Sequence, residues 1–167
     1  AMAKPKQVWD SAYRALMGKA PKRHIGSLYG FASRMCETPY AFEASWKATT
    51  EGLAEDLCDF LDLDYDIGTA PDGAVLIRVG EAEQTATLNL PEDVPTTSVM
   101  TAVARLSNIV CLSITPVNDG DDLWFLMLSR EKAETLLQSL GSYFNDVFEE
   151  VKGDGARMIP KRKEGRS

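Results

Sequence analysis

Histidine is almost absent from this chain: His24 is the only one in 167 residues. The commonest forms of nucleophilic catalysis, the Ser-His-Asp and Cys-His sites, would therefore all depend on this one residue. It lies in the segment PKRHIG beside Lys22 and Arg23, whose positive charges disfavour its protonated form. We therefore interpret His24 as a surface or helix-start histidine. The sequence favours a protein that is not an enzyme.

Cysteine is also scarce. The three residues Cys36, Cys58 and Cys111 are odd in number, widely spaced and flanked by apolar neighbours. A disulfide framework or a zinc site needs more ligands at closer spacing. We expect buried free thiols, since free cysteine behaves as a small hydrophobic residue. The expectation is a protein without metal or cofactor in a reducing compartment, the cytoplasm.

Long apolar runs are missing too. No run approaches the roughly 20 residues that a membrane-spanning helix needs, and the first segment, AMAKPKQVWD, lacks the apolar stretch of a secretory signal. We expect no membrane partner. The composition, 44% hydrophobic and 26% charged, is typical of a globular protein.

Two short patterns suggest chemistry and have simpler explanations. The segment 62–73 (DLDYDIGTAPDG) has acids at the first, third and fifth positions of a calcium loop. It lacks the glycine and glutamate required at the sixth and twelfth. Ser129 and Lys132 match the S-x-x-K pattern of serine acylases, but the serine stands where a strand should give way to a helix. We interpret Ser129 as a helix N-cap.

Hydrophobic spacing and turn residues predict the order of elements. Helices are expected at about 8–17, 25–35, 38–63, 97–108 and 130–151, and strands at about 74–80, 84–90, 109–117 and 123–129. The order α-α-α-β-β-α-β-β-α, with short connections, predicts an α+β fold: an antiparallel sheet of about four strands packed by helices. We divide the chain into a basic helical extension (1–37), an acidic core domain (38–152) and a flexible basic tail (153–167).

From residue 43 onward the predicted order becomes α-β-β-α-β-β-α. Together with a pI near 4.8, this order loosely resembles that of small type III secretion chaperones. The resemblance covers about two thirds of the chain and rests on no residue motif. The extra N-terminal helices depart from that family, so we do not assign the chain to it.

Charge is sorted along the chain more strongly than the net value of −7 suggests. Residues 1–34 contain seven basic residues and one acid, Asp10, and residues 152–167 contain six basic residues and two acids. The intervening residues 35–151 contain 22 acids and five basic residues. Two basic ends therefore flank a very acidic body.

The predicted helix 38–63 carries the densest group of acids. They are Glu51, Glu55, Asp56, Asp59 and Asp62. Their spacing places them on or beside one helix face, and no basic residue occurs between Lys47 and Arg78. Like charges four residues apart destabilise a helix. The face could simply keep the protein soluble, dock a basic partner, or seat the chain's own basic ends.

These patterns favour a non-enzymatic protein-protein interaction domain. Its acidic surface would bind a basic or partly unfolded protein, as a chaperone, immunity protein or inhibitor does. One alternative is a nucleic-acid-associated accessory protein that contacts phosphates through its basic ends. The candidate phosphate contacts are Lys22, Arg23, Lys161, Arg162 and Lys163. A carboxylate-based enzyme around Glu55, Asp59 and Asp62 is less favoured, and a homodimer is compatible with the pattern.

Overall fold

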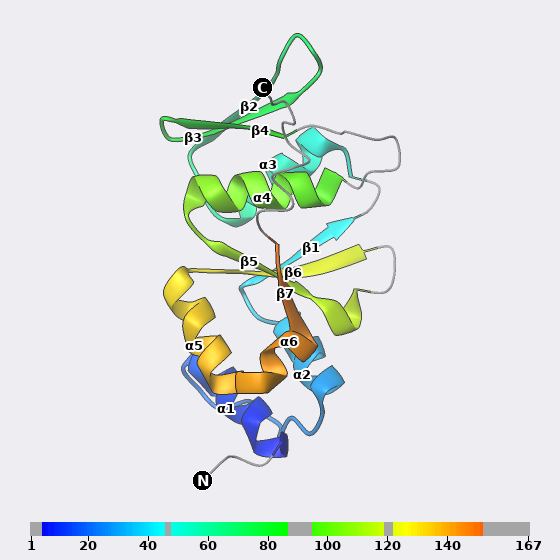
Figure 1. Ribbon diagram of the computed structural model, residues 1–167, viewed down its shortest axis with the longest axis vertical. Coiled ribbons are helices and arrows are strands. Elements are labelled where there is room, and N and C mark those ends of the chain that lie inside the picture. Colours follow the sequence, from blue (N-terminus) through cyan, green and yellow to red (C-terminus); the bar gives the residue numbers. More distant parts are fainter. Residues whose placement is uncertain (1–4, 46–47, 87–94, 119–121, 152–167) are drawn as a thin grey trace. The chain divides into compact units, whose positions relative to one another are not determined.

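The computed structural model describes residues 5–45, 48–86, 95–118 and 122–151 (Figure 1). Two antiparallel sheets, one of four strands and one of three, are packed with helices. The α+β prediction is therefore confirmed, with two sheets in place of one. By its internal contacts the chain splits into two compact units: residues 1–43 with 112–150, and residues 44–111 with 151–167.

The first unit combines both ends of the described chain. Its sheet has the order β1-β6-β5-β7, and the division between the units runs through β1 and β5. Helix α1 packs against α5 and α2, and α5 packs against β6. The elements are α1 (Pro5–Met17), α2 (Leu28–Met35), β1 (Ala41–Ser45), β5 (Val110–Ile114), the 3-10 turn η1 (Thr115–Val117), β6 (Asp122–Leu128), α5 (Arg130–Leu140), the 3-10 turn η2 (Gly141–Tyr143), α6 (Phe144–Val147) and β7 (Phe148–Glu150).

A cluster of aromatic rings forms part of the core of this unit. Phe31 of α2 is fully buried and lies between Trp9 of α1 and Phe148 of β7, with ring centroids 5.3 and 6.3 Å apart. Tyr143 packs edge-on against Trp9 at 5.2 Å, and Phe144 packs against Phe148 at 5.3 Å. These contacts connect elements from the two ends of the described chain.

The second unit is a three-stranded sheet with two helices. Its elements are α3 (Thr50–Phe60), β2 (Tyr65–Thr69), β3 (Val75–Val79), β4 (Ala82–Ala86) and α4 (Pro95–Ser107). The sheet order is β2-β3-β4, and both pairings are antiparallel. Helices α3 and α4 pack against each other and against this sheet (Figure 1). Val75 and Ile77 are buried on the sheet, whereas Asp66, Arg78 and Glu83 are exposed and stand side by side in its register.

The helix predicted over 38–63 is wrong in its first half. Thr38 ends α2 instead of starting a helix: its hydroxyl donates a 2.8 Å hydrogen bond to the Met35 carbonyl. The next residues form β1, in which buried Phe42 and Ala44 alternate with exposed neighbours as a half-buried strand requires. The true N-cap of α3 is Thr49, whose hydroxyl accepts a 2.9 Å bond from the Gly52 N–H.

The helix predicted over 130–151 is wrong in its second half. Gly141 ends α5 with a φ of +56°, a backbone conformation that glycine adopts without the strain other residues incur. Residues 148–150 then pair with β5 as the edge strand β7. At the start of α5, Ser129 accepts a 3.2 Å bond from the Lys132 N–H, so the N-cap prediction is confirmed.

Candidate functional site

The segment 44–111, the continuous part of the second unit, is strongly acidic. It contains twelve acids and three basic residues. The structure describes ten of those twelve acids, and all ten are exposed. Residues 112–150 of the first unit are acidic as well, with eight acids and two basic residues, but they share that unit with the basic N-terminal residues.

Helix α3 carries four of the ten, and Asp62 follows two residues after its end. We call Glu51, Glu55, Asp56, Asp59 and Asp62, the five acids predicted to bind a partner, the acidic ridge. Every one of them is exposed. The opposite face of α3 is buried through Leu53, Ala54, Leu57 and Cys58. The structure therefore places the predicted site residues together along the outer side of one helix and its C-terminal turn.

Strand β2 fixes two members of the acidic ridge. The Tyr65 hydroxyl donates a 2.8 Å hydrogen bond to Asp59 Oδ1, and the Thr69 hydroxyl lies 3.5 Å from Glu51 Oε2. The bond to Asp59 stabilises the protonated phenol and raises the pKa of Tyr65 to about 12. Tyr65 therefore acts as a neutral donor that holds this carboxylate in place.

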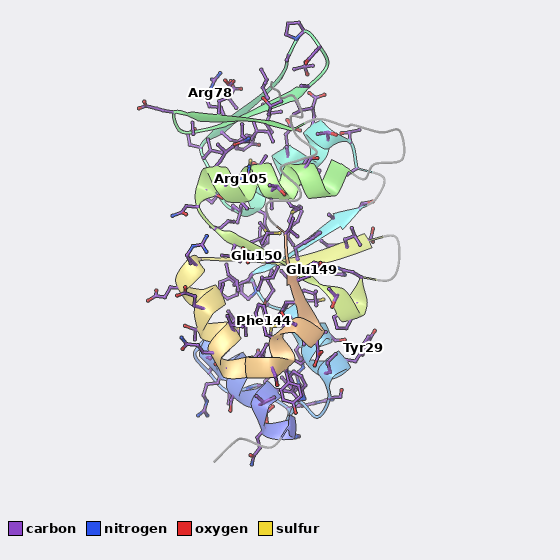
Figure 2. All side chains as sticks on the ribbon, viewed as in Figure 1. Tyr29, Arg78, Arg105, Phe144, Glu149 and Glu150 are labelled. Carbon is purple, nitrogen blue, oxygen red and sulfur yellow. The ribbon has the colours of Figure 1, made fainter. Side chains whose placement is uncertain are left out.

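No acid of the ridge forms an ion pair with another residue in the part of the chain that the structure describes. Arg78, the nearest basic residue along the described chain, pairs instead with Asp66 at 3.3 Å and Glu83 at 3.8 Å (Figure 2). Its charge is therefore already engaged on the sheet. Among the described residues, no basic side chain compensates the negative charge of the ridge.

This arrangement is unfavourable for the helix itself. Glu51 and Glu55 are four residues apart, as are Glu55 and Asp59, and such like-charged pairs each cost a few tenths of a kcal/mol. The last turn of α3 contains no basic residue, and Asp59 in that turn opposes the helix macrodipole. Glu51 in the first turn favours the helix, but we expect the repulsion between these acids and the position of Asp59 to lower the stability of α3.

An aromatic side chain flanks the acidic ridge. Phe60 ends α3 and is 38% exposed. It follows Asp56 by one helical turn, so the two side chains lie on the same side of the helix. Exposed aromatic residues beside charges are typical anchor positions of protein interfaces.

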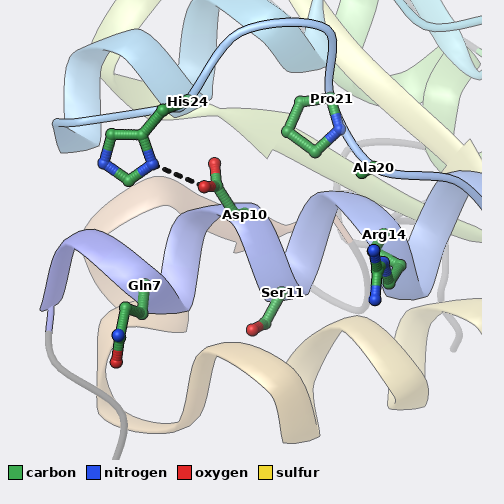
Figure 3. Close-up of a pocket in the computed structure, with 7 residues that line it drawn as sticks. All are labelled: Gln7, Asp10, Ser11, Arg14, Ala20, Pro21 and His24. Carbon is green, nitrogen blue, oxygen red and sulfur yellow. Dashed lines mark hydrogen bonds and ion pairs between the residues drawn. The ribbon is translucent and has the colours of Figure 1, made fainter.

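A second feature, the cleft between α1 and the loop that follows it, was not predicted. It measures about 500 Å³ and is lined by Gln7, Asp10, Ser11, Arg14, Ala20, Pro21 and His24 (Figure 3). His24 Nδ1 lies 2.5 Å from Asp10 Oδ2, and the Ile25 N–H donates a 2.8 Å bond to Asp10 Oδ1. Asp10, the single acid of a basic segment, was the only sequence signal for this pairing.

The cleft does not assemble a catalytic triad. Figure 3 shows Ser11 pointing away from His24, so the two side chains cannot act as nucleophile and base. Nor do the thiols supply a nucleophile: burial, reinforced by nearby acids, raises the pKa of Cys36 and of Cys58 to about 11. Cys58 and Cys111 are buried as predicted, Cys36 is half-buried, and none of the three is in a disulfide.

Carboxylates also meet at one place in the first unit. Burial, a hydrogen bond that protonated Glu43 donates to Asp122 and the charge of Asp122 raise the pKa of Glu43 on β1. Within the described ranges, however, no three metal-ligating side chains come together. This carboxyl pair therefore lacks the third ligand that a metal centre needs.

The candidate phosphate contacts fall in two groups. Lys22 and Arg23 are exposed on the loop between α1 and α2, where they separate two residues of the cleft lining, Pro21 and His24. Lys161, Arg162 and Lys163 lie outside the described residues, as does the predicted tail 153–167. The structure thus brings one of the two basic groups to the edge of the cleft.

Replacing Asp10 with asparagine is expected to lower the free energy of unfolding by on the order of 1 kcal/mol at pH 7. Burial raises the pKa of Asp10, but its bonds to Ile25 and His24 outweigh this and leave the pKa below its usual value of 3.8. A lowered pKa stabilises the folded state above that value and loses the effect as the pH falls through the folded-state pKa. The difference between wild type and variant should therefore shrink below about pH 4.

Denaturant titrations at several pH values between 7 and 3 measure this difference. Asp146→Asn, an exposed acid of α6, is the matched control and should remain close to wild type. A difference for Asp10→Asn that stays constant down to pH 3 would show that the carboxylate charge does not hold the loop.

No known protein family, curated protein or solved structure matches this chain. Over the described residues, no helix is long and apolar enough to cross a bilayer. The function has to be argued from the residues and their geometry alone.

Proposed function

We propose that this protein is a cytoplasmic, non-enzymatic interaction protein, and that the acidic ridge of α3 binds a basic or partly unfolded partner protein. The observation that carries the proposal is the row of exposed acids without an ion-pair partner among the described residues. We expect this row of like charges to lower the stability of α3. A basic partner would reverse the effect by supplying positive charges.

Two further observations support a binding surface over a merely solubilising one. The hydroxyl of Tyr65 positions the carboxylate of Asp59, and an acid that only confers solubility needs no such partner. Phe60 offers exposed aromatic area beside Asp56. A partner segment with lysine or arginine next to an apolar residue would match both the charge and this aromatic anchor. A chaperone, immunity protein or inhibitor of a basic protein could use such a surface.

Affinity capture from the native host, followed by mass spectrometry, tests the proposal. The variant reverses three charges, Glu51→Lys, Glu55→Lys and Asp56→Lys. Asp59 is left unchanged because it accepts the Tyr65 hydroxyl. We expect the wild type to retain a basic protein that is released by moderate salt, and the variant to lose it, because like charges across an interface cost several kcal/mol.

The matched control reverses three exposed acids of the first unit, Glu131→Lys, Glu134→Lys and Asp146→Lys. It changes the net charge equally and should keep the partner. Far-UV circular dichroism confirms that both variants are folded. Retention of the partner by the α3 variant, or equal loss in both variants, would contradict a specific role for the acidic ridge.

A further inference from the structure

We propose that the cleft between α1 and the following loop binds a small phosphate-bearing molecule. This site is separate from the acidic ridge and of opposite charge. Its volume of about 500 Å³ lies within the roughly 300–1,000 Å³ of small-molecule sites. That volume is sufficient for a ligand the size of a nucleotide or a sugar phosphate.

The charge of this segment is reversed relative to the chain as a whole. Residues 10–25 contain four lysines and arginines and one acid, in a protein of net charge −7. The basic residues are Arg14, Lys19, Lys22 and Arg23. All four are exposed, and none forms an ion pair with another described residue. Solubility does not explain this reversal, which creates a local field that attracts anions.

The cleft carries a cationic donor at one end. Figure 3 shows Arg14 on the side of Pro21, and His24 at the other end. The guanidinium of Arg14 matches the paired oxygens of a phosphate. His24 uses Nδ1 on Asp10, which leaves its second ring nitrogen for a polar group of a ligand.

Asp10, the acid of the cleft lining, is bonded to the loop. Both of its carboxylate oxygens are engaged by the loop, Oδ1 by the Ile25 N–H and Oδ2 by His24. Its role in the site is positioning: it orients the imidazole and holds the loop on α1.

The loop is attached at further points, so the cleft is largely preformed. The Gly18 N–H donates a 2.8 Å hydrogen bond to the Arg14 carbonyl oxygen. Nη2 of Arg34, on α2, donates a 3.4 Å bond to the Arg23 carbonyl oxygen. Ile25 is 3% exposed and anchors the loop in the core. A preformed cleft binds with a smaller loss of conformational entropy than a flexible one.

Titration of the full-length protein with inorganic pyrophosphate, followed by NMR, tests this proposal. Because the chain contains one histidine, its ring signals report on the cleft without overlap. We expect saturable shifts at His24, Ile25 and the Arg14 side chain at constant ionic strength. Arg14→Gln should weaken binding by roughly tenfold or more, the loss expected for one charge-assisted hydrogen bond.

Arg105→Gln removes the same charge from an exposed arginine of α4 and should bind as the wild type does. The double variant Lys22→Gln with Arg23→Gln is expected to weaken pyrophosphate binding without unfolding, since both residues are exposed. Linear, non-saturating shifts, or equal affinity of Arg14→Gln and wild type, would overturn the proposal. Binding of single-stranded oligothymidine without binding of pyrophosphate would also overturn it, in favour of a nucleic-acid surface.

Discussion

The Phe31→Ala variant is expected to lose about 3–5 kcal/mol of unfolding free energy, the range for truncating a buried aromatic residue. The ring is fully buried and contacts Trp9 and Phe148 from two other elements. Its removal leaves a cavity at the point where α1, α2 and β7 meet. Denaturant titration followed by tryptophan fluorescence measures the loss, since Trp9 lies 5.3 Å from the deleted ring.

Tyr29→Ala is the matched control for this variant. Tyr29 is also an aromatic residue of α2, but it is 62% exposed (Figure 2). Its truncation should change the unfolding free energy by less than about 0.5 kcal/mol. If Phe31→Ala were as mild as Tyr29→Ala, the aromatic cluster would not be part of the core.

The second prediction with a large expected effect compares substitutions on the two faces of α3. Leu57→Ala is expected to lower the unfolding free energy by about 2–5 kcal/mol, because Leu57 is fully buried against its neighbours. Glu55→Gln, on the opposite face of the same helix, should be neutral or stabilising by a few tenths of a kcal/mol, because it relieves repulsion from Glu51 and Asp59.

Thermal and denaturant unfolding followed by far-UV circular dichroism measures both variants. The comparison of Leu57→Ala with Glu55→Gln bears on function, because it shows whether the acids of α3 contribute to folding. A substantial destabilisation by Glu55→Gln would mean that the acidic ridge has a structural role. Its exposure would then not indicate a binding surface.

The sequence predicted the elements that have a strong internal pattern. The apolar spacing of α1 and α4, the hairpin strands β5 and β6, and the serine cap of α5 were all found close to where the structure has them. The acidic ridge was also predictable, because helical spacing alone places its members on one side. These features depend on neighbours within a few residues along the chain.

The errors came from contacts between distant residues. β1 and β7 are short edge strands. The helical spacing of α3 extends back over β1, and that of α5 extends forward over β7. The helices themselves begin at the cap Thr49 and end at the cap Gly141. β2 contains an acid, Asp66, and a glycine, Gly68, both of which local propensity disfavours in strands. The pairing of Asp10 with His24 spans fourteen residues, and the isolated acid in a basic segment does not by itself identify its partner. In each case tertiary packing overrides the local preference.

Hydrogen-deuterium exchange of the protein bound to its captured partner tests the central claim most directly. We expect reduced exchange to concentrate on residues 50–62 and on the neighbouring strand β2, and to disappear when Glu51, Glu55 and Asp56 are replaced by lysine. Reduced exchange confined to the first unit, with α3 exchanging as in the free protein, would contradict a partner bound at the acidic ridge.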